Sequence, residues 1–169
     1  QKPIVNPHAM PEAWFVERAT KAASPDDAIE RIGTADLRRE AIVQGDEGGA
    51  FATDSAATIR QTAFAPDRVT YESQSAADGM AVFSEIYYPA GWKATIDGQE
   101  ADIVRANYAL RALRIPAGRH NIEFTFAPTS FRVGNMISTA ASAVAALLMV
   151  AGVALSLRRK QPAGEERKE

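Results

Sequence analysis

Two patterns of hydrophobic and polar residues divide the chain. From Ala57 to Phe126, apolar and polar residues alternate in short segments, whereas the run from Val133 to Leu157 contains no charged residue. Alternation with a period of two is typical of strands with one buried face, and a long uncharged run is typical of a helix that crosses a membrane. The sequence therefore predicts a β-rich domain followed by a membrane span.

The alternating part predicts a mainly β fold. Its segments are separated by turn sequences such as Pro66-Asp67, Pro89-Ala90-Gly91 and Pro116-Ala117-Gly118. Short strands at such spacing favour an antiparallel β-sandwich, Ig-like or jelly-roll-like. The expected strands cover residues 57–64, 67–74, 79–87, 91–97, 99–106, 109–115 and 119–126.

Two local patterns in this region are specific. Asp97-Gly98 predicts a two-residue hairpin turn in which both central residues need positive φ. In the last strand, Ile122, Phe124 and Phe126 are expected to face the core, and the polar residues between them are expected to face water.

The N-terminal part predicts a strand around Trp14, a short helix and a second strand at 40–44. Ser24-Pro25-Asp26-Asp27 supplies an N-cap, a proline at the first helical position and acids in the first turn, and Gly33 ends the helix. One side of this helix is expected to carry Ala28, Ile29 and Ile32.

These patterns divide the chain into four parts. Residues 1–56 form a strand–helix–strand portion with a solvated glycine-rich loop, packed on the β-domain, and residues 57–130 form the sandwich. Residues 131–158 form the transmembrane helix, and residues 159–169 form a cytoplasmic tail.

The charges that flank the uncharged run predict its orientation. As a helix, Val133 to Leu157 is about 37 Å long, which is enough to cross a hydrocarbon core of about 30 Å. Arg158, Arg159 and Lys160 follow the run, and Arg132 precedes it. The positive-inside rule therefore favours a cytoplasmic C-terminus and an extracytoplasmic location for residues 1–130. Translocation of so large a segment requires earlier membrane segments, so we expect this chain to be the C-terminal piece of a larger membrane protein of the bacterial cell membrane.

Small residues four apart in the span, Ser138, Ser142 and Ala146, have two explanations. Such spacing allows another helix to approach closely. An alanine-rich span also produces the same spacing by composition alone, and the sequence does not separate the two.

Charge and residue counts narrow the function classes. The net charge of −2 gives no electrostatic basis for binding nucleic acid, and the lack of cysteine excludes disulfides, thiolate metal sites and a cysteine nucleophile. His8 and His120 have no partner at metal-ligand spacing, and His120 is expected to be a rim residue bonded to a turn. We predict no cofactor and no metal.

No catalytic residue is predicted either. The acids available for a glycosidase-type pair are Asp97, Glu100 and Asp102, or Glu72 and Glu85. Asp97 already belongs to a turn, and Glu100 and Asp102, which share one face of an expected strand, are equally explained as solvated side chains.

The remaining candidate is a binding surface around adjoining turns, with Trp92, Arg105, Asn107 and Tyr108 as contacts for a glycan or a partner, and Tyr87, Tyr88 and Arg111 beside them. Aromatic faces with arginine and asparagine donors suit a sugar or phospho-sugar. The alternative is structural: Trp92 packs in the core, Tyr88 supports a turn, and Asn107 supplies a left-handed residue. Aromatic residues in sandwiches are mostly buried framework, which favours the alternative.

Three segments resemble the C-terminal region of the YfhO-like family of bacterial multi-pass membrane proteins. They are "NPHAMPEAWFV" at 6–16, "SEIYYPAGWKATIDGQEADIVRANYALRALRIPAGRHNIEFTFAP" at 84–128, and "SFRVGNMIS" at 130–138. The resemblance covers most of the chain apart from residues 45–70 and the tail. Ala90 departs from the family pattern by lengthening the turn before Gly91-Trp92.

The resemblance implies a parent protein similar to GT-C-type glycosyltransferases, which use lipid-linked sugars to modify cell-envelope polymers such as lipoteichoic acid. In such enzymes the acidic catalytic residues lie near the N-terminal membrane helices, a region without a counterpart here. The expected role is an extracytoplasmic accessory β-domain plus the last membrane span, inert by itself. Its expected partners are the rest of the parent, the lipid bilayer, and a glycan or lipid-linked sugar. The alternative is a membrane-anchored binding or assembly module without enzymatic activity.

Overall fold

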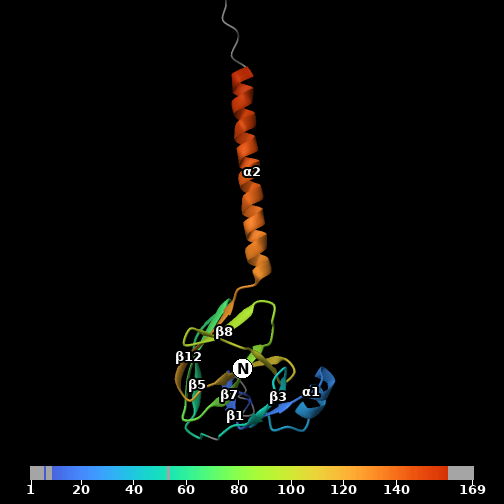
Figure 1. The fold of residues 1–169 in the computed structure, drawn as a ribbon, viewed down its shortest axis with the longest axis vertical. Helices are drawn as coiled ribbons and strands as arrows, with labels where there is room; N and C mark the ends of the chain where they lie inside the picture. Colours follow the sequence, from blue (N-terminus) through green and yellow to red (C-terminus); the bar gives the residue numbers. More distant parts are fainter. Residues whose placement is uncertain (1–5, 7–8, 53, 160–169) are drawn as a thin grey trace, which may run out of the picture. The chain divides into compact units, whose positions relative to one another are not determined.

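The computed structural model describes residues 6, 9–52 and 54–159, which form two separate compact units (Figure 1). The first unit ends at Ala127 and the second begins at Pro128. In the first unit the chain order is β1 (Ala13–Val16), β2 (Arg18–Lys21), α1 (Pro25–Ile32), β3 (Glu40–Gln44), β4 (Gly49–Ala50), β5 (Thr58–Ala65), β6 (Arg68–Ser75), β7 (Gly79–Ile86), β8 (Trp92–Ile96), β9 (Gln99–Ala101), β10 (Val104–Ala106), β11 (Leu110–Ile115) and β12 (Gly118–Phe126).

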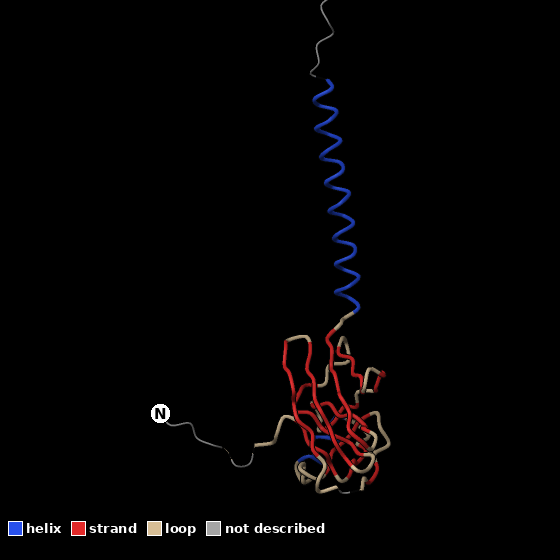
Figure 2. The backbone as a smooth tube through the Cα atoms, turned by 90° about the vertical axis from the view of Figure 1, so that its left-hand side faces the viewer, coloured by secondary structure: helices blue, strands red, loops and turns tan. Residues whose placement is uncertain are grey.

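The strands of the first unit form two sheets (Figure 2). The seven-stranded sheet has the order β1-β7-β11-β10-β3-β2-β4, and the five-stranded sheet has the order β5-β6-β12-β8-β9. Strands from residues 13–50 therefore pair with later strands, since β1 pairs with β7 and β3 pairs with β10.

The seven-stranded sheet curls round on itself. Strand β1 is five places from β2 in the sheet order, yet Glu17 alone separates the two strands in the chain. The backbone N–H groups of Glu17 and Arg18 both donate to the carbonyl of Arg39, beside β3. Apolar side chains on the inside of the curl form one core cluster, which consists of Val16, Ala19, Ala41, Val43, Met80, Val82, Val104, Ala106 and Ala112.

The two sheets pack face to face through a second core cluster. From β7, Ala81 and Phe83 point into it, whereas the alternate residues Met80 and Val82 point into the curl. Burial on both faces explains why β7 reads as a nearly continuous apolar segment. The five-stranded sheet contributes Val69, Tyr71, Ala94, Ile122 and Phe124.

The predicted mainly β fold with one apolar C-terminal helix is confirmed, and two details differ. Strands β2 and β3 run parallel, because α1 connects them as a crossover. The strand expected at 99–106 is two strands, since β9 pairs with β8 in one sheet and β10 pairs with β11 in the other. Asp102 lies in the connection between them, so it does not share a strand face with Glu100.

The short helix α1 begins and ends as predicted. The Ser24 hydroxyl accepts from the Asp27 N–H at 3.1 Å, Pro25 is the first helical residue, and Gly33 is the C-cap. Ala28 is fully buried beside Ile42 of β3. Ile29, expected on the same side as Ala28 and Ile32, is 52% exposed.

The hairpin prediction at Asp97-Gly98 is confirmed. Ile96 pairs with Gln99, and φ is 51° at Asp97 and 82° at Gly98. In β12, Ile122 and Phe124 are buried as predicted, but Phe126 is 37% exposed. Alternation gives the correct face for Phe126, and the residue is exposed because the strand reaches the end of the sandwich there.

The second unit contains helix α2 (Thr129–Arg159), whose segment Val133–Ser156 is long and apolar enough to cross a membrane, with a mean hydropathy of 2.0. Thr139 lies in this segment, and its hydroxyl donates to the Asn135 carbonyl at 2.8 Å, which satisfies a polar group without a partner outside the helix. Lys160 and the rest of the tail lie outside the described residues.

Candidate functional site

Trp92, the central residue of the predicted surface, makes contacts with the framework of the domain. It begins β8, is partly buried, and packs against the core cluster between the sheets. Its ring lies 5.4 Å from the ring of Phe126, and the guanidinium of Arg111 lies 4.4 Å from its centroid. One face of the indole is therefore already covered by a protein cation.

Arg111 is buried between the two sheets, with a side chain that is 4% exposed. Its guanidinium lies between the rings of Trp92 and Phe124, 4.4 and 4.6 Å from their centroids, and Nη2 is 2.5 Å from Oε2 of Glu85. Tyr71 donates to the other oxygen of Glu85 at 2.8 Å. Placing Arg111 on a binding surface was therefore wrong.

Burial of this group changes the protonation equilibria around it. Loss of hydration lowers the pKa of Arg111. The negative charge of Glu85 opposes this decrease. Burial raises the pKa of Tyr71 above its ordinary value, and the hydrogen bond to Glu85 raises it further. Nε and Nη1 of Arg111 have no hydrogen-bond partner within the described residues, so Glu85 and the aromatic faces provide the compensation for burying this cation.

Asn107 supplies a left-handed turn residue, as the structural alternative predicts. Its φ is 46°, its side chain is buried, and its Oδ1 accepts from the Ile42 N–H at 2.9 Å. Its own N–H donates to the Ile42 carbonyl at 2.7 Å. Asn107 therefore fastens the β10–β11 turn to β3, and its amide oxygen is not open to a ligand.

Arg105 and Tyr108 form a local pair on the same turn. The Arg105 Nε donates to the Tyr108 carbonyl, and the guanidinium lies 5.0 Å from the centroid of the Tyr108 ring. Tyr108 has a φ of 68°, which is uncommon for a bulky residue, and it is 38% exposed. The structure thus brings Arg105, Asn107 and Tyr108 together, whereas the ring contacts of Trp92 run to Phe126 and Arg111.

Four of the carboxylates considered for catalysis, Asp97, Glu100, Glu72 and Glu85, face basic groups. Oδ2 of Asp97 is 2.6 Å from Nδ1 of His120, and the Asn121 N–H donates to Oδ1 at 2.8 Å. Glu100 receives a hydrogen bond from Lys93, Glu72 receives one from Arg119, and Glu85 pairs with Arg111. Within the described residues, no three histidine or acidic side chains are close enough to hold a metal ion.

His120 is bonded to a turn, as the sequence predicts. Its Nδ1 faces Asp97, and its Nε2 is 3.3 Å from the Ala117 carbonyl. Because both neighbours are acceptors, the doubly protonated ring is favoured, and the bond to Asp97 raises the pKa of His120. The same bond lowers the pKa of Asp97. His8 lies outside the described residues.

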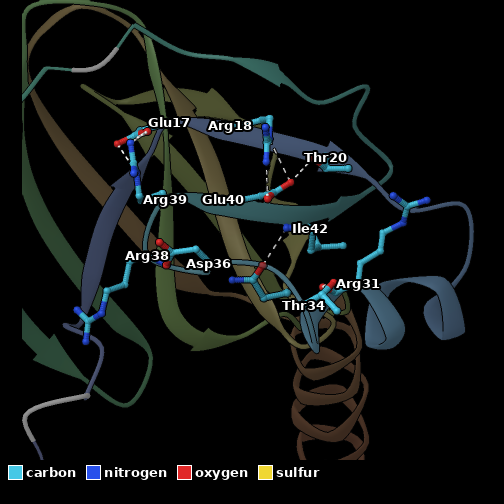
Figure 3. A network of polar contacts seen from close by, with 11 residues as sticks. Glu17, Arg18, Thr20, Arg31, Thr34, Asp36, Arg38, Arg39, Glu40 and Ile42 are labelled. Atoms are coloured by element: carbon cyan, nitrogen blue, oxygen red, sulfur yellow. Dashed lines mark hydrogen bonds and ion pairs between the residues drawn. The ribbon is translucent and has the colours of Figure 1, made fainter.

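A second polar cluster at the β2–β3 edge consists of paired charges (Figure 3). Arg18 donates twice to Glu40, at 3.2 and 2.7 Å, and Arg39 donates twice to Glu17, at 2.9 and 2.7 Å. Hydrogen bonds from Arg18 and Thr20 lower the pKa of Glu40. These bidentate pairs lie where β2 and β3 begin.

An open hollow of about 590 Å³ lies beside β1, where sequence motifs gave no signal. It is lined by aromatic residues, Trp14, Phe15 and Phe51, and by polar residues that include Asp54 and Ser55. The Trp14 Nε1 donates to the Leu37 carbonyl at 2.9 Å, so the polar edge of this indole is already satisfied. Its lining comes from segments far apart in the chain, which is why no motif marks it.

An apolar rim occupies one end of the domain. It consists of Phe64, Ile86, Tyr88 and Phe126, which are 70, 72, 53 and 37% exposed. The rings of Tyr88 and Phe126 are 6.3 Å apart, and the Phe126 N–H donates to the carbonyl of Asp67, in the turn that follows β5. The sequence analysis placed Phe126 in the core and did not single out Phe64 or Ile86.

The comparisons with known proteins address the family. A family model for the bacterial membrane protein YfhO matches residues 50–138, which is more than half of the chain. The match includes residues 50–70, which the three resembling segments leave out, and it excludes residues 6–16. No curated protein and no solved structure matches the chain. Because the match covers more than half of the chain, the chain belongs to the YfhO family of bacterial membrane proteins, and the matched stretch contains strands β5 to β12 and the start of α2.

Proposed function

We propose that this chain is the extracytoplasmic accessory β-domain and last membrane span of a YfhO-like glycosyltransferase, which transfers sugar from a lipid carrier to cell-envelope glycans. The observation that carries the proposal is the continuity of the family match. It runs from β5 through the whole five-stranded sheet and into α2. The family match thus joins strands β5 to β12 to the first turns of α2.

An accessory role agrees with the state of the polar groups. The buried cation of Arg111 is held by Glu85, and Asn107 is occupied by Ile42 of β3. Groups that are fixed in this way maintain the shape of a domain, so we assign the transfer chemistry to other membrane segments of the parent. The domain then covers or shapes the active site of the parent at the outer face of the membrane.

The activity test compares the intact parent with this chain. In proteoliposomes with a lipid-linked sugar and an acceptor glycan, the parent transfers sugar and the purified 169-residue chain does not. Deletion of residues 9–127 from the parent lowers transfer. Sugar transfer by the purified chain alone would contradict the accessory role.

The topology test places single cysteines in this chain, whose 169 residues include none. Gln74→Cys lies on an exposed position of β6, and Ala163→Cys lies in the tail. In intact cells a membrane-impermeant maleimide labels position 74, and it labels position 163 only after lysis. The reverse labelling pattern would place the β-domain in the cytoplasm and exclude the proposal.

A membrane-anchored binding or assembly module is the second candidate, because the apolar rim is an exposed surface of the kind that partners bind. The coding sequence upstream of Gln1 distinguishes the two proposed functions. Several membrane spans encoded upstream of Gln1 support the glycosyltransferase parent, whereas a single signal peptide there supports the module.

A further inference from the structure

The apolar rim lies at the end of the β-domain from which the chain continues toward the span. Phe126 ends β12, Trp92 opposite it begins β8, and the β5–β6 turn beside it follows Phe64. Leu110 pairs with Ile86, and the Tyr87 N–H donates to the Ala109 carbonyl. These pairings place the Arg105–Tyr108 turn at the same end.

Chain length keeps this end close to the bilayer. From Phe126 to Thr129 the chain spans at most about 11 Å, and the helix rises about 6 Å more to Val133, where the apolar segment begins. The apolar segment Val133–Ser156, at about 36 Å, is longer than a hydrocarbon core of about 30 Å. Its ends therefore reach the headgroup layers. The opposite end of the domain is about 30 Å away along β12.

We propose that the apolar rim docks onto the phospholipid headgroup layer of the bilayer that holds α2. Tyrosine is enriched at this interface because its ring is apolar and its hydroxyl stays near water. Phenylalanine is typical of the apolar faces that bury into the boundary between headgroups and acyl chains. Lys93, 62% exposed beside Trp92 and paired with the exposed Glu100, and Arg105 are the cations at the same end that lipid phosphates can reach. Arg105 and Tyr108 thereby gain a lipid-facing role.

The shape of the rim favours lipid over a sugar. Its side chains come from the ends of β5, β7 and β12 and from the β7–β8 connection, and three of them, Phe64, Ile86 and Phe126, carry no polar group. A sugar site instead needs several polar groups that converge in a concave pocket. A fluid headgroup layer accepts separate apolar side chains without such convergence.

The test measures the depth of spin labels in the full 169-residue chain. Phe64→Cys and Tyr88→Cys carry nitroxides on the rim, and Gln74→Cys carries one at the opposite end of the same sheet. The chains are placed in nanodiscs of phosphatidylcholine with phosphatidylglycerol. We expect the ratio of oxygen to nickel-chelate accessibility to be severalfold higher at positions 64 and 88 than at 74. An unchanged melting temperature shows that each labelled chain is folded, and Ile86→Cys replaces either rim variant that is not.

Two results would overturn the proposal. Equal ratios at positions 64, 74 and 88 mean that the rim faces water. Low accessibility of positions 64 and 88 to both oxygen and nickel means that protein covers the rim, and dilution of the chain in the nanodiscs then tells whether that protein is a second copy. Neither result bears on sugar transfer by the parent, so this test and the activity test fail independently.

Discussion

Two arginine–glutamate pairs of the β-domain place the same chemical groups in opposite environments. Arg111 is 4% exposed between the sheets and contacts Glu85 at 2.5 Å. Arg39, just before β3, is 66% exposed and donates twice to Glu17. By hydrogen-bond geometry the exposed pair is the better one, because Arg39 is bidentate and Arg111 leaves two nitrogens without a partner in the described part of the chain.

The difference shows that burial, rather than the number of hydrogen bonds, determines how much stability is lost when one partner of such a pair is removed. Both Arg111 and Glu85 lose hydration on folding, so either group without the other is an uncompensated buried charge. Water replaces the partner of an exposed ion, and exposed pairs contribute about 0–1 kcal/mol. The buried pair therefore tolerates the loss of both charges better than the loss of one.

The largest expected effect is that of Arg111→Ala. It leaves the partly buried Glu85 without its cation and removes the group between two rings, so we expect a loss of about 3–5 kcal/mol in the free energy of unfolding. Denaturation of the β-domain in the detergent-solubilised chain measures this loss. The control is the double variant Arg111→Leu, Glu85→Leu, which recovers most of the stability. A loss below about 1 kcal/mol would mean that the buried pair behaves like a surface pair.

Trp92→Ala has the next largest effect and decides between framework and binding site. Truncating a buried tryptophan lowers the free energy of unfolding by about 3–5 kcal/mol. Because the Trp92 ring is partly buried and its removal exposes Arg111, we expect a loss of about 2–4 kcal/mol. Tyr88→Ala is the matched control, because it removes an exposed ring that also contacts Phe126. An unchanged melting temperature together with lost glycan binding would restore Trp92 as a contact residue.

The sequence predicts what is determined locally. Alternation and turn residues place the strands and the Asp97-Gly98 hairpin, because period and positive φ depend on neighbouring residues. Strand ends and sheet membership depend on distant partners. The break between β9 and β10 at Asp102 and the parallel β2–β3 pair therefore leave no local signal.

The candidate site follows the same division. The left-handed conformation of Asn107 was predictable from residue type. Arg111 shares a strand face with the buried residues Leu113 and Ile115, so its pattern indicated burial. The burial of this arginine is compensated by Glu85 and Phe124, which other strands supply. Similarly, alternation predicts the face of Phe126 but not that the opposing layer ends before it.

Arg39→Ala is expected to lower the free energy of unfolding by at most about 1 kcal/mol, although Arg39 donates two hydrogen bonds. Raising the salt concentration should reduce the difference from the unmodified chain, because surface pairs are screened. A double-mutant cycle with Glu17→Gln isolates the pair energy. A coupling as large as that between Arg111 and Glu85 would remove the contrast between the two environments.

The smallest expected effect is the pH dependence of the His120–Asp97 pair, a third case between the buried and exposed extremes. Because Asp97 raises the pKa of His120, the pair stabilises the fold fully below the unfolded histidine pKa of about 6.5, and this contribution is lost as pH rises through the folded pKa. Asp97 has a lowered pKa, so its contribution is lost as pH falls through that value. The pair therefore stabilises most in mildly acidic solution. NMR titration of the imidazole in a His8→Gln background measures the shift, and Asp97→Asn, which retains a residue suited to positive φ, should return the pKa of His120 toward its ordinary value. A titration unchanged by Asp97→Asn would show that the Ala117 carbonyl, rather than the carboxylate, holds the proton on the ring.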